Sequence, residues 1–138
     1  MTTIDRLLHW VEEVFPPKSA YAHCDLPCGV YDPAQARIEA ESVKACQEKF
    51  QASEDESFRQ RAVMIKEERA ELVKHHLWVL WTDYFKAEHL QRVPQLHVIF
   101  WKATKAAGAA KKSNDPADGQ KLLDAIAEVD AAFRATKA

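Results

Sequence analysis

Residues 57–84, SFRQRAVMIKEERAELVKHHLWVLWTDY, form the longest segment of the chain with a helical pattern. Side chains expected to face inward recur along it at three- and four-residue spacing. They are Ile65, Arg69, Leu72, His76, Val79 and Leu80. Because an amphipathic helix of this kind is marginal on its own, it needs partners that cover its apolar stripe.

A first partner helix is expected upstream. Asp32 is a suitable N-cap, Pro33 fits the first helical position, and the helical pattern continues through Phe50. Its inward face comprises Glu39, Val43, Cys46 and Phe50, with Ile38 at the margin. A polar break at residues 53–56 separates it from the long helix.

Two further helices are expected downstream, after a connection at residues 87–93. Pro94 is predicted in the first turn of the third helix, and residues 111–119 are predicted to form a turn before a fourth helix from about Pro116. The inward residues of these two helices are Leu96, Ile99, Phe100, Ala103 and Ala107, and then Leu122, Ile126, Val129 and Phe133. Four amphipathic helices with short links predict an all-α, antiparallel four-helix bundle.

Composition supports this fold and excludes several function classes. The 138 residues suffice for one domain, and 3 glycines and 6 prolines are too few for an all-β fold. A net charge of -2 argues against nucleic acid or an anionic membrane as a partner. The longest uncharged apolar run, Leu77 to Trp81, is too short to span a bilayer, so we expect a soluble, cytoplasmic protein.

Residues 1–22 are expected to be a leader that is separate from the domain at residues 23–138. Pro16 and Pro17 end a short amphipathic stretch, and the composition changes sharply at His23. Ala20-Tyr21-Ala22 fits a signal-peptidase site superficially. The charged residues before it leave no apolar core of 7 residues or more, which argues against general secretory export.

The strongest chemical signal is the hook, residues 23–33, HCDLPCGVYDP. It concentrates one imidazole and two thiols in six residues, and no second Cys or Cys-His pair with zinc-finger spacing follows. If the chain were cut before His23, the new α-amine, the Cys24 amide nitrogen and the thiolates of Cys24 and Cys28 could form a square N2S2 set. The His23 imidazole could add a fifth ligand. Such geometry favours Ni(II) or Cu(II), with Pro27 stiffening the loop and Gly29 permitting a tight backbone.

The hook resembles the nickel hook of the nickel superoxide dismutases, which has the form H-C-x-x-P-C-G-x-Y. The resemblance continues through AQARIEAESVKA, IKEERAEL, KHHLWVLWTDYF and DPADGQK. It implies a four-helix bundle, a homohexamer, one nickel ion per subunit, superoxide as substrate, and a protease that removes the leader. It also implies Ni(II)/Ni(III) cycling, with dioxygen and hydrogen peroxide as products.

The resemblance assigns roles to particular residues. The nickel ligands would be His23, Cys24 and Cys28, and Tyr31 would guard the open face of the metal. Glu39 and Arg69 would hold the His23 imidazole, and Asp25 would support the ligands without binding nickel. The helical pattern independently favours a Glu39–Arg69 pair, because both charges lie on otherwise apolar stripes and would be costly if buried alone.

The other candidate residues are expected to have packing, loop or surface roles, with His89 and His97 at loop or surface positions. Cys46 is expected to fill the core, and His75 and His76 diverge too far on a helix to share one ion. His89 and His97 have no partner at ligand spacing. The aromatic residues expected in the core or a subunit interface are Trp78, Trp81, Tyr84 and Phe85, of which Tyr84 is also expected to approach the hook.

Two alternative functions stay open at this point. The hook could bind or traffic nickel or copper without turnover, or the chain could be a helical assembly protein with redox-active thiols. An open face sized for a small anion and guarded by Tyr31 would distinguish the enzyme from a metal carrier.

Overall fold

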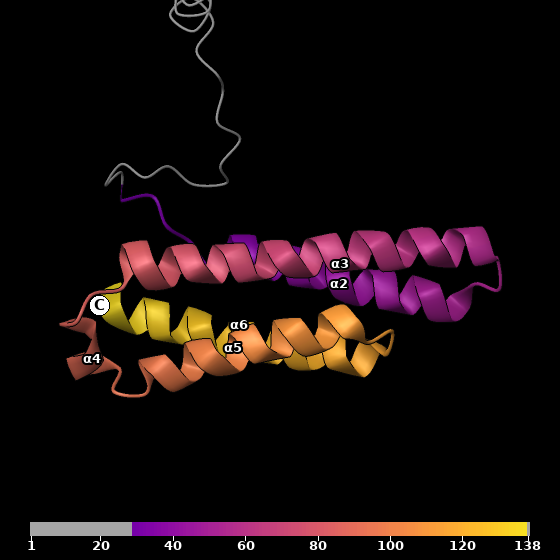
Figure 1. Ribbon diagram of the computed structural model, residues 1–138. Coiled ribbons are helices and arrows are strands. Elements are labelled where there is room, and N and C mark those ends of the chain that lie inside the picture. Colours follow the sequence, from indigo (N-terminus) through magenta and orange to yellow (C-terminus); the bar gives the residue numbers. More distant parts are fainter. Residues whose placement is uncertain (1–28, 138) are drawn as a thin grey trace, which may run out of the picture.

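Four long helices run through residues 29–137, the part of the chain that the computed structural model describes. They are α2 (Ala34–Ala52), α3 (Glu56–Val79), α5 (Leu96–Lys112) and α6 (Pro116–Lys137). The helices α2 and α3 form one layer and α5 and α6 the other (Figure 1). Short turns join the two helices within each layer, a longer connection at residues 80–95 leads from α3 to α5, and sequential long helices run antiparallel. Each long helix packs mainly against two others around a shared core, and α2 also contacts α5 diagonally. The predicted all-α four-helix bundle is confirmed.

Aspartate side chains start three of these helices. The carboxylate of Asp32 accepts a hydrogen bond from the Ala34 backbone N–H at 2.8 Å, although Pro33 rather than Asp32 is the N-cap residue and α2 begins one residue later than predicted. Asp55 accepts from Ser57 N–H at 3.1 Å, and Asp115 accepts from Ala117 N–H at 2.9 Å. Each bond satisfies a backbone donor that has no partner within the helix, and thereby fixes where the helix begins.

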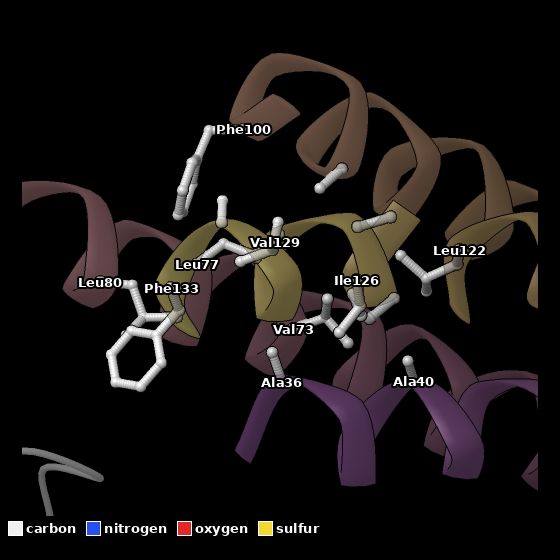
Figure 2. Close-up of a cluster of buried hydrophobic side chains, with 14 of the residues drawn as sticks. Ala36, Ala40, Val73, Leu77, Leu80, Phe100, Leu122, Ile126, Val129 and Phe133 are labelled. Atoms are coloured by element: carbon white, nitrogen blue, oxygen red, sulfur yellow. The ribbon is translucent and has the colours of Figure 1, made fainter. Parts of the chain in front are cut away.

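The core confirms the predicted stripes of the last two helices. Leu96, Phe100, Ala103 and Ala107 of α5 and Leu122, Ile126, Val129 and Phe133 of α6 are all buried, and Ile99 is partly buried against this core. Several of these side chains meet α2 and α3 in Figure 2. In α5 and α6, large apolar side chains at helical spacing therefore correctly identified the buried face of each helix.

The predicted stripes of α2 and α3 were partly wrong. Val43, His76 and Leu80 are buried, but Ile38 is 53% exposed and Ile65 is 42% exposed. Smaller residues occupy much of the interface instead: Ala36, Ala40, Ala62, Ala70 and Val73. Alanines let the two backbones approach closely, and this leaves the bulkier side chains on the flanks.

Several boundaries also differ from the prediction. The turn predicted at residues 111–119 spans only residues 113–115, and Gly119 is a buried residue of α6. The end of the predicted 57–84 helix is the π-helix η1 (Leu80–Tyr84), and the connection at 87–93 contains α4 (His89–Arg92). Pro94 lies in the turn before α5. Among the described residues, no helix is both long enough and apolar enough to cross a membrane.

Two buried polar side chains hold the α5–α6 turn against α2 and α3. The Lys66 ammonium donates to the Ser113 carbonyl and to Asn114 Oδ1, both at 2.7 Å. Gln47 Nε2 donates to the carbonyls of Ala110 and Ser113 at 3.2 and 3.0 Å. Burial lowers the pKa of Lys66 because it disfavours the charged form, and the carbonyls at the end of α5 compensate its charge.

Gly119 and Gly108 provide a matched test of helix packing. An alanine Cβ at Gly119 would clash with Gln47 Oε1 and would lie 2.8 Å from Lys44 Cβ and 2.9 Å from Lys44 Cα, whereas at Gly108 the nearest atom would be Lys74 Nζ at 3.6 Å. We expect Gly119→Ala to lower the free energy of unfolding by about 1–2 kcal/mol, because α6 must move away from α2. Gly108→Ala should raise it by up to about 1 kcal/mol through helix propensity.

Chemical denaturation followed by circular dichroism measures both changes. A stabilising effect of Gly119→Ala would contradict the close α2–α6 approach.

Candidate metal centre

The structure describes the hook only from Gly29 onward. The predicted ligands His23, Cys24 and Cys28, and the supporting Asp25, lie outside the described residues. Gly29 has φ of 72°, a left-handed conformation that side-chain-bearing residues rarely adopt. A glycine is therefore suited to this position, as predicted, whereas the loop that carries Cys28 lies outside the described residues.

The donor chemistry suits nickel. Within residues 29–137 no group of three or more His, Cys, Asp or Glu side chains is placed to hold a metal ion. Thiolate and imidazole donors, which suit nickel, are concentrated at residues 23–28 of the sequence.

Tyr31 links the described end of the hook to an aromatic cluster. Its ring centroid lies 5.6 Å from that of Tyr84, with the rings tilted by 54°. Tyr84, the last residue of η1, also contacts Phe133 at 4.6 Å and stacks on His89 at 5.4 Å. The expectation that Tyr84 approaches the hook is confirmed at Tyr31, and the bundle holds this part of the hook through ring packing.

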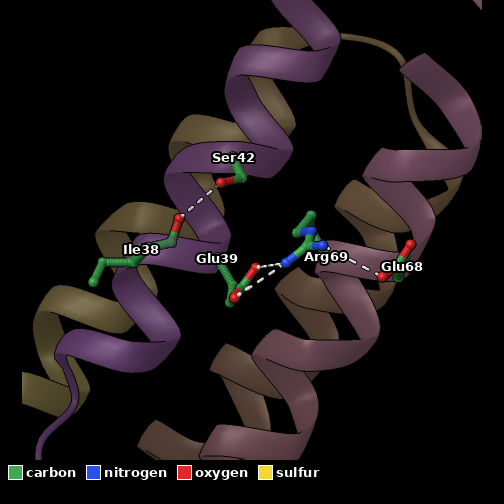
Figure 3. A network of polar contacts seen from close by, with 5 residues as sticks. All are labelled: Ile38, Glu39, Ser42, Glu68 and Arg69. Carbon is green, nitrogen blue, oxygen red and sulfur yellow. Dashed lines mark hydrogen bonds and ion pairs between the residues drawn. The ribbon is translucent and has the colours of Figure 1, made fainter. Parts of the chain in front are cut away.

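Glu39 and Arg69 form the predicted pair between α2 and α3 (Figure 3). Arg69 Nη1 lies 3.3 Å from Glu39 Oε2 and 3.5 Å from Oε1, and Arg69 Nη2 lies 3.3 Å from Glu68 Oε1. The side chains of Glu39 and Arg69 are 17% and 34% exposed, so the pair is partly buried rather than part of the core. The guanidinium of Arg69 thus contacts Glu39 through Nη1 and Glu68 through Nη2, so two carboxylates share its positive charge.

This exposure reduces the energetic effect that a fully buried pair would have. We expect Glu39→Met and Arg69→Met each to lower the free energy of unfolding by about 1 kcal/mol. The double variant should lose less than the sum, with a coupling energy of about 0.5–1 kcal/mol. Urea unfolding of all four proteins measures this coupling.

Glu68→Gln is the matched control, because its carboxylate contacts the same guanidinium from a more exposed position. It should change stability by less than about 0.5 kcal/mol. Strictly additive effects of Glu39→Met and Arg69→Met would contradict a direct contact.

Cys46 is partly buried rather than a core residue, and it is the free cysteine among the described residues. Burial raises the pKa of its thiol, an effect that Arg69, Lys49 and Lys66 oppose. A protonated thiol is a poor nucleophile and metal ligand, so the structure gives Cys46 no part in the candidate site.

The histidines of the bundle pack against other rings. His75 and His76 meet edge-on at 5.5 Å, and His97 contacts Trp81 at 4.9 Å. His89 Nδ1 accepts the Lys86 backbone N–H at 3.0 Å. The packing or surface roles predicted for His75 and His76 are confirmed. His97 is exposed, as predicted, and His89 is partly buried at the start of the short helix α4.

The aromatic residues near the end of α3 differ in exposure. Phe85 is buried, and Trp81 and Tyr84 are partly buried against the core. Trp78, at 51% exposure, is not a core residue, because it lies on the outer face of α3.

The described residues form a helical bundle, and just ahead of α2 the sequence carries a short segment that concentrates cysteine and histidine side chains. The family model for nickel-containing superoxide dismutase matches residues 18–137. The chain belongs to this family. It is therefore classed as an oxidoreductase that uses nickel.

Curated and solved relatives agree with this assignment. The chain is 61% identical over 128 residues to a superoxide dismutase [Ni] from Streptomyces seoulensis, covering 92% of this chain and 98% of that protein. It is 59% identical, with the same coverage, to a superoxide dismutase [Ni] from Streptomyces coelicolor. A solved nickel superoxide dismutase superposes with a TM-score of 0.81 at 62% identity, covering 83% of this chain and 98% of that one.

Proposed function

We propose that this chain converts superoxide to dioxygen and hydrogen peroxide at a nickel ion bound by His23, Cys24 and Cys28. The observation that carries this proposal is that the family match includes the hook and continues through the whole bundle. Binding or trafficking of metal without turnover gains no support from the named relatives.

The hook would hold nickel through nitrogen and sulfur donors. His23 would supply its α-amine and imidazole, Cys24 its amide nitrogen and thiolate, and Cys28 its thiolate. Nickel bound by these anionic donors supplies one-electron chemistry between Ni(II) and Ni(III). The left-handed Gly29 and the packed Tyr31 would anchor the loop that carries Cys28.

Residues of the bundle would control access and orient the ligands. Tyr31, backed by Tyr84, would limit entry to small anions and order water near the substrate. Glu39, held by Arg69 at 3.3 Å, would accept the free N–H of the His23 imidazole. A hydrogen bond of this kind fixes the ring orientation of a ligating histidine. Asp25 would support the hook between the two cysteines.

The leader proposal rests on coverage as well as on chemistry. The chain covers 98% of a solved relative, yet that match includes only 83% of this chain. The part of this chain without a counterpart in that relative is about as long as residues 1–22. A protease that cuts before His23 would create the α-amine ligand.

A homohexamer is the proposed assembly, and the cytoplasm the proposed location. Large apolar side chains on the described surface favour self-association, because they would be shielded in an assembly. They include Ile38, Met64, Ile65, Trp78, Val98 and Trp101.

A reconstitution experiment tests the proposed activity. The chain beginning at His23 is reduced, loaded separately with nickel, copper or zinc, and assayed for superoxide consumption. Nickel alone should give sustained turnover with peroxide as product, and chelation should abolish it. Nickel binding without dismutation would instead support the metal-carrier alternative.

A further inference from the structure

The last turn of α6 meets Tyr84 at its hydroxyl and at its ring. Thr136 Oγ1 lies 2.8 Å from the Tyr84 phenolic oxygen, although the two residues are 52 positions apart in the chain. The Lys137 ammonium lies 4.8 Å from the centroid of Phe133 and 5.9 Å from that of Tyr84. The C-terminal end of α6 therefore borders the aromatic cluster behind Tyr31.

The hydrogen bonds of Thr136 have a defined direction. Thr136 Oγ1 lies 2.6 Å from the carbonyl oxygen of Phe133, and a carbonyl can only accept. The single hydroxyl proton of Thr136 is committed to this bond. In the 2.8 Å contact, Tyr84 must therefore be the donor and Thr136 the acceptor. The result is a chain from the Tyr84 hydroxyl through the Thr136 hydroxyl to the Phe133 carbonyl.

We propose that Thr136 is a positioning residue for the Tyr31–Tyr84 pair, fixing Tyr84 as a donor toward α6. The lone pairs of the phenolic oxygen are then left to accept a hydrogen bond from water or another donor near the hook. Donation to Thr136 also polarises that oxygen and strengthens it as an acceptor. A role of the Tyr31–Tyr84 pair in dismutation rests on the proposed function. The direction of the hydrogen bond from Tyr84 to Thr136 does not depend on it.

The backbone of Thr136 is held independently of its side chain. Arg92 Nη1, at the end of α4, donates to the Thr136 carbonyl at 3.2 Å. A threonine hydroxyl that bonds back to its own helix is common and by itself only shapes the helix end. The contact with Tyr84 gives the hydroxyl a second partner, so its removal should affect the phenol while Arg92 still holds the backbone.

Raman spectroscopy of the full-length, metal-free chain tests the bond direction. The intensity ratio of the tyrosine Fermi doublet distinguishes a phenol that donates from one that only accepts. The difference spectrum between wild type and Tyr84→Phe isolates Tyr84, and it should show a donor. Thr136→Val should lose the donor signature, while Thr136→Ser should retain it with the same helix content. An acceptor-only Tyr84 in wild type, or an unchanged doublet in Thr136→Val, would overturn the proposal.

Turnover tests the positioning role. In the nickel-loaded chain beginning at His23, Thr136→Val should slow dismutation roughly two- to tenfold without loss of nickel, and Thr136→Ser should restore it. Equal rates for wild type and Thr136→Val would refute the role in the reaction. A wild-type chain without activity would refute the proposed function instead, and the Raman result would still decide the bond direction.

Discussion

Serine in place of Cys24 or Cys28 is expected to abolish nickel retention and superoxide dismutation together. A neutral hydroxyl is a harder and weaker donor than a thiolate, and it gives no anionic charge to the metal. Loss of a partner that merely orients a ligand already costs about 10- to 100-fold in metal affinity. Loss of a ligand should therefore reduce affinity and activity by more than about 100-fold, as measured by metal analysis and a dismutase assay.

Cys46→Ser is the matched control, because it removes a thiol that lies on the bundle outside the hook. It should leave nickel content and activity close to wild type. The far-ultraviolet circular dichroism of all three variants should stay helical, since the described core of buried apolar residues, from Ala36 to Phe133, joins the four long helices to one another. Full activity in Cys24→Ser or Cys28→Ser would refute the proposed ligand set.

The two halves of the bundle were not equally predictable from sequence. In α6, Leu122, Ile126 and Val129 are large, apolar and regularly spaced, and all three are buried. In α3, the same reasoning favoured Ile65 over Ala70, although Ile65 is exposed and Ala70 is fully buried. Hydrophobicity identifies the buried face of a helix when bulky apolar residues dominate that face. A face packed through alanines is not identified in this way, because its burial depends on how closely the partner helix approaches.

Buried polar groups were the second class of feature that the sequence pattern missed. Lys66 and Gln47 lie in the interior because the end of α5 and the turn after it supply carbonyl and amide oxygens there. Those acceptors come from residues more than 45 positions away in the chain, so no local pattern indicates them. Only the tertiary structure shows that these polar side chains have partners.

The described part of the candidate site was more predictable, because its signals are local or involve charge. The positive φ of Gly29 fits the glycine expected just after Cys28, and the Glu39–Arg69 pair follows from opposite charges on apolar stripes. The extent of burial of that pair could not be predicted. The role of Thr136 was also hidden, because its contact with Tyr84 depends on how α6 ends beside η1.

The largest expected effect of a single covalent change concerns the bond between Ala22 and His23. While that bond is intact, the His23 nitrogen belongs to a planar amide whose lone pair is delocalised, so it cannot act as an amine donor. The full-length chain would then lack one of the two nitrogen ligands in the proposed N2S2 set. We therefore expect incomplete nickel binding and little activity before the leader is removed.

Three proteins test this expectation: the full-length chain, the chain beginning at His23, and the same chain with one extra alanine before His23. All are reduced, supplied with nickel, and compared for metal content and dismutase activity. Only the chain beginning at His23 should be fully active, because the single added alanine converts the amine back into an amide while leaving every side chain in place. Equal activity in the extended chains would show that the α-amine is not a ligand, and another donor would have to complete the site.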